Sequence, residues 1–439
     1  MKQADPKPTH TQLNRHLGLW GAMMMGLGAM VGTGVFVSIG VAAGIAGPSV
    51  LPAILVAAGV AVCNALSSAQ LAAAHPVSGG TYEYGYRYLH PTLGFTAGWM
   101  FLCAKSASAA TAALGFGGYL LHVLGRSSPG AVTLLGTTVS ILVTLLVLSG
   151  LKRSNLANIL IVASTLTALF IFIGFAGSAA IRQPGNPLVP FFPEGENSVG
   201  AFLQACALMF VAYTGYGRIA TMGEEVKNPR KTIPAAIIAV TAVSAVLYMA
   251  VGLAAIGAFG AVQLGEATRA QAAPLEIVLR SLGHPTAATI VALGAMTAML
   301  GVLLNLILGL SRVALAMGRR GDLPSAFSKI NRNGSTPTVA VIAVGGLVTA
   351  LTVLGDVKLT WSFSAFTVLV YYAITNTAAL RLADTERLYP RWISVLGIAA
   401  CLFLAFWVEP AIWMAGLGLI AAGLLWHRIM AATSRAQRS

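Results

Sequence analysis

The chain has 439 residues, of which 57% are hydrophobic and only 9% are charged, and its mean hydropathy is +0.80. A soluble domain carries about 25% charged residues, so this composition excludes a water-soluble globular protein. The formal net charge of +14 is spread over short connectors between apolar stretches. That distribution argues against a nucleic-acid partner and indicates that the lipid bilayer is the surrounding medium.

Apolar runs long enough to cross a bilayer, about 20 residues each, follow one another along nearly the whole chain. We expect twelve spans, near residues 18–44, 51–74, 94–123, 131–149, 155–181, 200–225, 233–259, 285–317, 337–354, 359–381, 391–408 and 410–428. The predicted fold class is an all-α integral membrane protein. Its parts are an N-terminal tail over 1–17, five helices over 18–181, five helices over 200–381, two further helices over 391–428 and a tail over 429–439.

The basic residues predict the orientation of these spans, because cytoplasmic loops carry an excess of Lys and Arg. Of the 27 Lys and Arg residues, Lys105 and Arg218 lie within spans. Five more lie on the side opposite the N-terminus, namely Arg126, Arg182, Arg269, Arg280 and Lys358. The other twenty lie on the N-terminal side. This bias predicts a multi-pass protein of the cell (inner) membrane with both termini in the cytoplasm.

The four cysteines lie inside apolar spans, far apart in sequence and without a CxxC or histidine pairing; they are Cys63, Cys103, Cys206 and Cys401. Such cysteines are small core residues. We therefore expect no disulfide, no metal site and no cofactor. The oligomeric state is left open by the sequence.

Two spans carry glycine-rich interruptions. The first contains Gly26, Gly28, Gly32 and Gly34, and the sixth reads Ala-Tyr-Thr-Gly-Tyr-Gly over 212–217. Each of these spans is the first helix of a five-helix block. Corresponding glycine-interrupted helices in two halves are typical of an inverted-repeat transporter with its site at the bilayer midplane.

Unwound backbone survives in a membrane only where it lines a cavity or is buried in protein. The N–H groups of Thr33 and Gly34 begin the second half-helix, where the positive end of the helix dipole suits a carboxylate. Freed carbonyls near Ala29, Met30, Ala212 and Tyr213 suit an ammonium group. A site with both is a zwitterion site. The predicted substrate-binding residues are Ala29, Met30, Gly32, Thr33, Gly34, Ala212, Tyr213, Gly215, Tyr216 and Arg218.

Two other interpretations apply to these glycines. Gly28 with Gly32, and Gly40 with Gly44, form GxxxG pairs that allow close helix packing. Residues 215–220 also spell the GxGxxG/A pattern of a dinucleotide loop. That loop requires a preceding strand and a βαβ unit, which the sequence lacks, so the dinucleotide interpretation is rejected.

Four segments together resemble the amino acid-polyamine-organocation superfamily of permeases over nearly the whole chain. Span 1 resembles the motif GxxxGxGxF. Residues 76–99 are similar to PxxGGxYxY followed by GFxxGW, residues 224–234 to EExKNPxxxIP, and residues 311–324 to SRxxxAxxRDGxLP. The resemblance implies a 5+5 inverted-repeat core with broken helices 1 and 6 plus two peripheral helices. It also implies secondary active transport of an amino acid, by symport or exchange and alternating access, with the cytoplasmic motifs as hinges and gates.

The chain departs from these relatives at the positions that couple transport to an ion. Many proton-coupled relatives have a lysine on helix 5 where this chain has Thr165, and sodium-coupled relatives use a helix 8 hydroxyl where this chain has Val302. Thr297 is a less suitable substitute. Uniport, exchange and a relocated proton carrier therefore remain open. The coupling candidates are Lys105, Thr165 and Arg218.

The two charges inside spans have both functional and structural interpretations. Lys105 lies deep in span 3, and intramembrane charges are usually functional; snorkelling or an ion pair is the structural alternative. Arg218 follows the second break and is able to hold a substrate carboxylate or replace a coupling cation. Pairing with a helix end, Glu224 or Glu225 is the alternative. Either way, a neutral or acidic amino acid is favoured over a cationic one.

Other function classes remain as alternatives. A membrane enzyme would need buried paired catalytic groups, and the sequence contains no HExxH or GxSxG motif. A substrate-sensing transceptor would normally need a partner-binding tail, whereas both tails are short. A transporter of another small amine or organic acid also fits the pattern.

Overall fold

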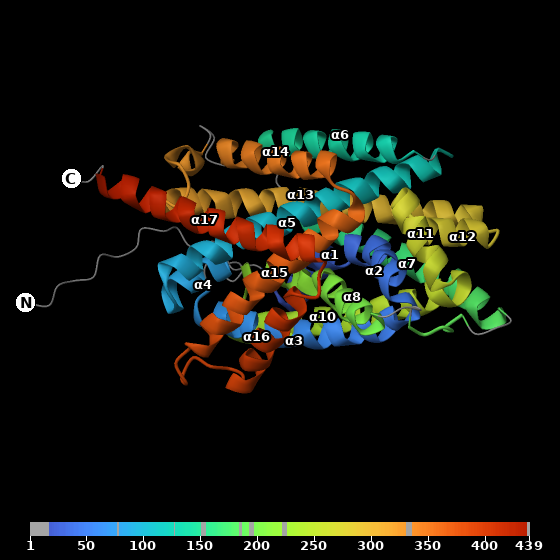
Figure 1. The fold of residues 1–439 in the computed structure, drawn as a ribbon, viewed down its shortest axis with the longest axis horizontal. Coiled ribbons are helices and arrows are strands. Elements are labelled where there is room, and N and C mark those ends of the chain that lie inside the picture. Colours follow the sequence, from blue (N-terminus) through green and yellow to red (C-terminus); the bar gives the residue numbers. More distant parts are fainter. Residues whose placement is uncertain are drawn as a thin grey trace, which may run out of the picture.

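The computed structural model describes residues 17–436 except 77–78, 127, 151–154, 184–186, 193–196, 222–225 and 331–335. Within this part of the chain the regular elements are helices, and the only extended pairing is a single bridge between Leu17 and Val226. The prediction of an all-α protein is therefore confirmed (Figure 1).

The first half of the described chain divides its first span into two helices. The elements are α1 (Leu19–Met30), the π-helical η1 (Gly34–Ser38), α2 (Ile39–Ala46), the 3-10 turn η2 (Gly47–Ser49), α3 (Val50–Ala74), α4 (Thr81–Tyr88), α5 (Pro91–Val123), α6 (Pro129–Leu148) and α7 (Asn155–Arg182).

The second half begins with another divided span. Its elements are α8 (Ser198–Tyr213), the 3-10 turn η3 (Thr214–Tyr216), α9 (Gly217–Thr221), α10 (Pro229–Phe259), α11 (Ala261–Gln271), α12 (Pro274–Ser281), α13 (Pro285–Arg320), η4 (Ser325–Ser328), α14 (Thr338–Leu354), α15 (Val357–Leu380), α16 (Arg391–Ala405) and α17 (Pro410–Ala436).

Proline and glycine set many of these boundaries. Pro91, Pro229 and Pro285 occupy the first position of α5, α10 and α13, where the missing N–H costs no helical hydrogen bond. Gly260 and Gly321 end α10 and α13 at φ values of 86° and 90°, a left-handed conformation that glycine adopts without a Cβ clash. Proline at the start and glycine at the end thus set the bounds of these long helices.

Eight helical segments of the described chain are long and apolar enough to cross a membrane: Leu19–Ala74, Gly130–Leu148, Leu156–Arg182, Ser198–Ala220, Pro229–Phe259, Pro285–Arg320, Val357–Leu380 and Pro410–Ala432. Thr338–Leu354 and Arg391–Ala405 are shorter apolar helices. Large apolar side chains are exposed on these helices, among them Leu134, Phe170, Val246 and Leu425. So much exposed apolar surface suits hydrocarbon rather than water, and the chain is a multi-pass membrane protein.

The interrupted helices lie in the middle of the bundle. Figure 1 shows α6 and α14 along one edge and α3 and α16 along the other, with α1 and α8 between them. The long helix α5 packs against α6, α13, α14 and α15, and α10 packs against α1, α3 and α7. α2 and η1 contact α8, and α1 contacts η3 and α9. The two interruptions therefore meet each other inside a helical shell.

The structure also contains helices that the apolar runs do not predict. The connector between the spans predicted over 233–259 and 285–317 holds α11 and α12, and the connector between the spans predicted over 51–74 and 94–123 holds α4. These helices are short and more polar, so a search for membrane-length apolar runs passes over them. Helix α17 continues to Ala436, into the predicted tail 429–439, because its alanine-rich end has high helix propensity.

Candidate functional site

A cavity of about 40 Å³ lies where the two interrupted helices meet. Its walls come from α1, η1, α5, α8, η3, α13 and α15. The lining residues are Ala29, Met30, Thr33, Gly34, Lys105, Ser108, Val211, Ala212, Thr214, Gly215, Val302, Leu306 and Trp361. Seven of them were singled out from the sequence as substrate or coupling residues, namely Ala29, Met30, Thr33, Gly34, Lys105, Ala212 and Gly215.

Both interruptions depart from α-helical geometry at the cavity. Helix α1 ends at Met30, and Val31 follows with extended torsion angles of φ −85° and ψ 90° before the π-helical turn η1. Helix α8 ends at Tyr213 and continues as the 3-10 turn η3. These changes in winding occur at the glycine-rich segments of the sequence and bring backbone polar groups to the cavity wall.

Glycine is required where the two interruptions touch. A Cβ atom on Gly215 would lie 2.6 Å from the carbonyl carbon and oxygen of Ala29 and from the Cα atom of Met30. A Cβ atom on Gly34 would lie 2.7 Å from the Cβ atom of Ala212. Real Cβ contacts are longer than this, so a side chain at either position would force the backbones apart. The same glycines thus allow the two helices to pack closely and allow their backbones to line the cavity.

Tyr248 of α10 joins the two interruptions. Its buried hydroxyl lies 2.7 Å from the carbonyl oxygen of Met30 and 3.0 Å from that of Ala212, and it donates to these acceptors. These two carbonyls are freed by the ends of α1 and α8. Sequence reasoning did not single out Tyr248, because nothing in the apolar run of α10 marks which side chain faces the breaks.

Lys105 connects α5 to the second interruption. Its side chain is only 8% exposed, and Nζ donates to Oγ1 of Thr214 over 2.7 Å. The Thr214 hydroxyl in turn donates to the carbonyl oxygen of Val211 over 2.7 Å. One turn further along α5, the Ser108 hydroxyl lies 2.7 Å from that of Ser364 on α15. Lys105, Ser108 and Thr214 form the polar wall of the cavity.

Two more lining residues bear on the cavity. Oγ1 of Thr33 is buried and has no hydrogen-bond partner among the described residues. Trp361 of α15 is buried and donates from Nε1 to the carbonyl oxygen of Leu208 over 2.9 Å. This hydrogen bond joins α15 to α8 beside the cavity. An unpartnered buried hydroxyl is costly, and Thr33 holds one in the wall of the cavity.

The remaining predicted binding residues lie beside the cavity rather than in its wall. Gly32 faces Val302, whose Cγ2 atom is 2.6 Å from where a Cβ of residue 32 would be. Tyr213 points to α3 and donates to the carbonyl oxygen of Ile54 over 3.3 Å. The ring of Tyr216 packs against that of Tyr372, with their centroids 5.4 Å apart.

The other coupling candidates also lie outside the cavity wall. Arg218 belongs to α9, beyond the second break, and its guanidinium approaches α13 at Gly309. Glu224 and Glu225, its predicted alternative partners, lie outside the described residues. Thr165 is buried in α7, where its hydroxyl donates to the carbonyl oxygen of Ile161 over 2.7 Å. Of the three candidates, the structure brings Lys105 alone into the cavity wall.

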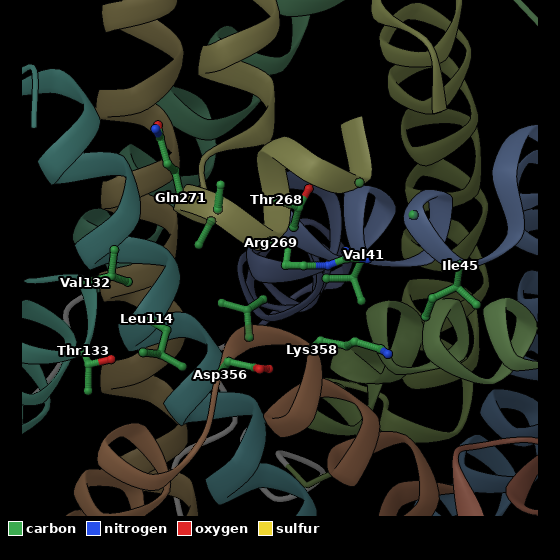
Figure 2. A pocket seen from close by; sticks show the side chains of 15 residues that line it. Val41, Ile45, Leu114, Val132, Thr133, Thr268, Arg269, Gln271, Asp356 and Lys358 are labelled. Atoms are coloured by element: carbon green, nitrogen blue, oxygen red, sulfur yellow. The ribbon is translucent and has the colours of Figure 1, made fainter. Parts of the chain in front are cut away.

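A larger cavity of about 180 Å³ lies between α2, α5, α6, α11 and the start of α15 (Figure 2). Figure 2 shows Arg269 on the side of α11 and Asp356 with Lys358 on the side of α15. Asp356 caps α15 by accepting from the N–H of Leu359, and Lys358 pairs with Glu409 over 2.5 Å. Asp356 and Lys358 therefore already have partners within the protein. The smaller cavity remains the candidate site, because backbone from both broken helices lines it.

A cluster around Asp322 brings two of the recognised motifs together. This carboxylate is buried and accepts from the hydroxyls of Tyr82 and Tyr86, each over 2.7 Å, and His427 of α17 lies 3.2 Å away. The pKa of both phenols is raised above the usual range, mainly by burial and then by the Asp322 carboxylate. Both phenols therefore keep their protons and donate to Asp322. The connector helix α4 is thereby fastened to the loop after α13.

Comparisons with known proteins show which family this chain resembles. The profile of the family described as amino acid permease matches residues 21–436. The chain is 37% identical over 434 residues to an uncharacterized transporter of Mycobacterium tuberculosis, covering 99% of this chain and 95% of that protein. It is 31% identical over 345 residues to a branched-chain amino acid permease of Bacillus subtilis, covering 75% and 72%. Over 382 residues it is 28% identical to a vacuolar cationic amino acid transporter of Arabidopsis thaliana, covering 83% and 62%.

Proposed function

The chain belongs to the amino acid permease family, and on that basis we propose that it is a secondary transporter that moves an amino acid across the cell (inner) membrane by alternating access. The observation that carries this proposal is the cavity between the two interrupted helices, with backbone from both breaks in its wall. A transporter needs a site that both halves of the molecule complete, because their relative motion then exposes it to each side in turn. An enzyme would instead need a constellation of catalytic groups.

The proposed topology has twelve spans arranged as a 5+5 inverted repeat with two peripheral helices. The first repeat runs over 18–181, the second over 200–381, and the closing helices over 391–428, with both termini in the cytoplasm. Two similar interruptions, one opening each block at Met30 and one at Tyr213, support this arrangement. The asymmetry of the basic residues supports the orientation.

The proposed binding mode places the main chain of the substrate between the breaks. Its carboxylate meets the backbone N–H groups and the hydroxyl at Thr33 and Gly34, and its ammonium group meets carbonyls of Ala29, Met30 and Ala212. The unpartnered Oγ1 of Thr33 supports the first contact. A carbonyl oxygen has two lone pairs, so Met30 and Ala212 are able to accept from an ammonium group while they also accept from Tyr248.

The substrate is proposed to be neutral or acidic rather than cationic. Among the lining residues of the described cavity, Lys105 is the one charged side chain, and none is acidic. A positive charge beside a low-dielectric site repels a cationic side chain strongly. The transport mode is proposed to be symport or exchange. Lys105 is the preferred place for a coupling charge because it contacts the second break directly.

Uptake into proteoliposomes tests this function. The purified protein is reconstituted, and radiolabelled amino acids are offered under an imposed proton gradient, under a sodium gradient, and with unlabelled amino acid inside the vesicles. The proposal expects saturable uptake of at least one neutral or acidic amino acid above protein-free vesicles. Stimulation by one gradient identifies symport, and stimulation by internal substrate identifies exchange. No amino acid uptake under any of these conditions would refute the proposed function.

A further inference from the structure

The side chains that line the cavity are of two kinds, polar and apolar. Lys105, Ser108 and Thr214 form the polar wall, whereas the apolar side chains of the lining are those of Val211, Val302, Leu306 and Trp361. Lys105 is three residues from Ser108 on α5, so the two side chains lie on the same face of that helix. The polar wall is therefore a compact group of one ammonium and two hydroxyls.

Among the residues that the structure describes, the ammonium group of Lys105 has no counter-charge. Its partner is the neutral hydroxyl of Thr214, at 2.7 Å. No ion pair of Lys105 occurs among the described residues, and the lining of the cavity contains no carboxylate. A buried cation costs several kcal/mol unless an anion and hydrogen bonds compensate it. An anionic group on the substrate would supply this counter-charge.

The second polar end of the cavity lies at the first break. There Thr33 presents a buried hydroxyl that has no partner among the described residues, next to the start of the second half-helix at Gly34. The cavity thus offers anion-binding groups at two separate places. The first is a helix start with a hydroxyl, and the second is an ammonium with two hydroxyls.

Resting on the transport function proposed above, we infer that the substrate is an amino acid whose side chain ends in a carboxylate, and that Lys105 is the residue that selects it. The main-chain carboxylate lies at Thr33 and Gly34. The side-chain carboxylate lies against Lys105 and is close to the hydroxyls of Ser108 and Thr214. Arg218 does not take this role, because its guanidinium lies beyond the break near Gly309 and does not line the cavity.

Substrate competition in proteoliposomes tests the inference. The wild-type protein is expected to take up aspartate or glutamate in preference to their neutral isosteres asparagine and glutamine. Lys105→Met keeps the length and apolar stem of the side chain but removes its charge. It is expected to lower kcat/KM for the acidic substrate by about 30-fold or more, as for a buried charge left unpaired, and to lower kcat/KM for the neutral isostere by a smaller factor, so that the preference for the acidic substrate is lost. Lys105→Arg keeps the charge and is expected to retain the acidic preference.

Thermal unfolding of the wild-type protein gives a second readout that needs no variant. Aspartate or glutamate is expected to raise the unfolding temperature more than asparagine or glutamine does, because a ligand that binds the folded state stabilises it. Two results would overturn the inference and leave the transport function standing. One is uptake of neutral amino acids with no acidic uptake, and the other is an equal loss of all substrates in Lys105→Met. Failure of every amino acid would refute the transport function itself.

Discussion

Tyr248→Phe should loosen the junction between the two interrupted helices. The substitution keeps the ring and removes only the hydroxyl that lies 2.7 Å from the carbonyl oxygen of Met30 and 3.0 Å from that of Ala212. One phenol carries one proton, so the loss amounts to about one buried hydrogen bond. Leaving a buried acceptor unpaired costs about 1–3 kcal/mol, which corresponds to about a 5- to 150-fold change in an equilibrium constant.

Hydrogen exchange of the reconstituted protein measures this change. Backbone amides over 29–34 and 211–216 should exchange faster in Tyr248→Phe by a factor within that range, because the segments open more often. Tyr84→Phe is the matched control. Tyr84 is also fully buried, yet its hydroxyl makes no hydrogen bond among the described residues, so its removal should leave exchange over both segments unchanged. Equal exchange in Tyr248→Phe and the wild type would refute the bridging role of this hydroxyl.

Two further substitutions test contacts at and near the connector helix α4. Asp322→Asn removes the charge that accepts from Tyr82 and Tyr86, and bonds to a charged group contribute about 1.5–3 kcal/mol. The thermal unfolding temperature in detergent should therefore fall by a few degrees, and an unchanged temperature would contradict this role. Burial first, and then Arg87, lowers the pKa of His75 below its usual value of 6.5. The neutral ring is thus favoured in the folded state, so stability is complete above pH 6.5 and is lost as the pH falls through the lower pKa of the folded state. His75→Gln should flatten that dependence in unfolding curves measured between pH 5 and 7; curves as steep as the wild type would contradict it.

The positions of the two helix breaks could be predicted from the sequence, because the glycines that allow a break lie at the break itself. A glycine-rich segment inside an apolar span lowers the cost of unwinding at that point, and the structure changes winding at Met30 and at Tyr213. Lys105 was also recognisable, since a charge in the middle of an apolar run stands out against its neighbours. In both cases the signal lies within a few residues of the feature.

Features that depend on how distant helices face each other were not predictable in the same way. Tyr248 contacts both breaks and Trp361 lines the cavity, yet they sit in apolar helices with nothing in the local pattern to show which side faces inward. The side chains of Tyr213, Tyr216 and Arg218 do not line the cavity, although these residues are close to the break in sequence. Each residue along a helix turns by about 100°, and the 3-10 turn η3 alters that rotation. Side-chain direction there is decided by packing against α3, α13 and α15.

The central claim is that substrate passes through the cavity where the two interruptions touch. Its most direct test is counterflow uptake by Gly215→Ala and Gly174→Ala reconstituted side by side in amounts matched by size-exclusion chromatography. The added methyl group at residue 215 meets the Ala29 and Met30 backbone at 2.6 Å, whereas at residue 174 it meets nothing within 4 Å. Overpacking of this kind costs about 1–3 kcal/mol. We expect Gly215→Ala to lose most of its uptake and Gly174→Ala to match the wild type; equal uptake by both variants would contradict the claim.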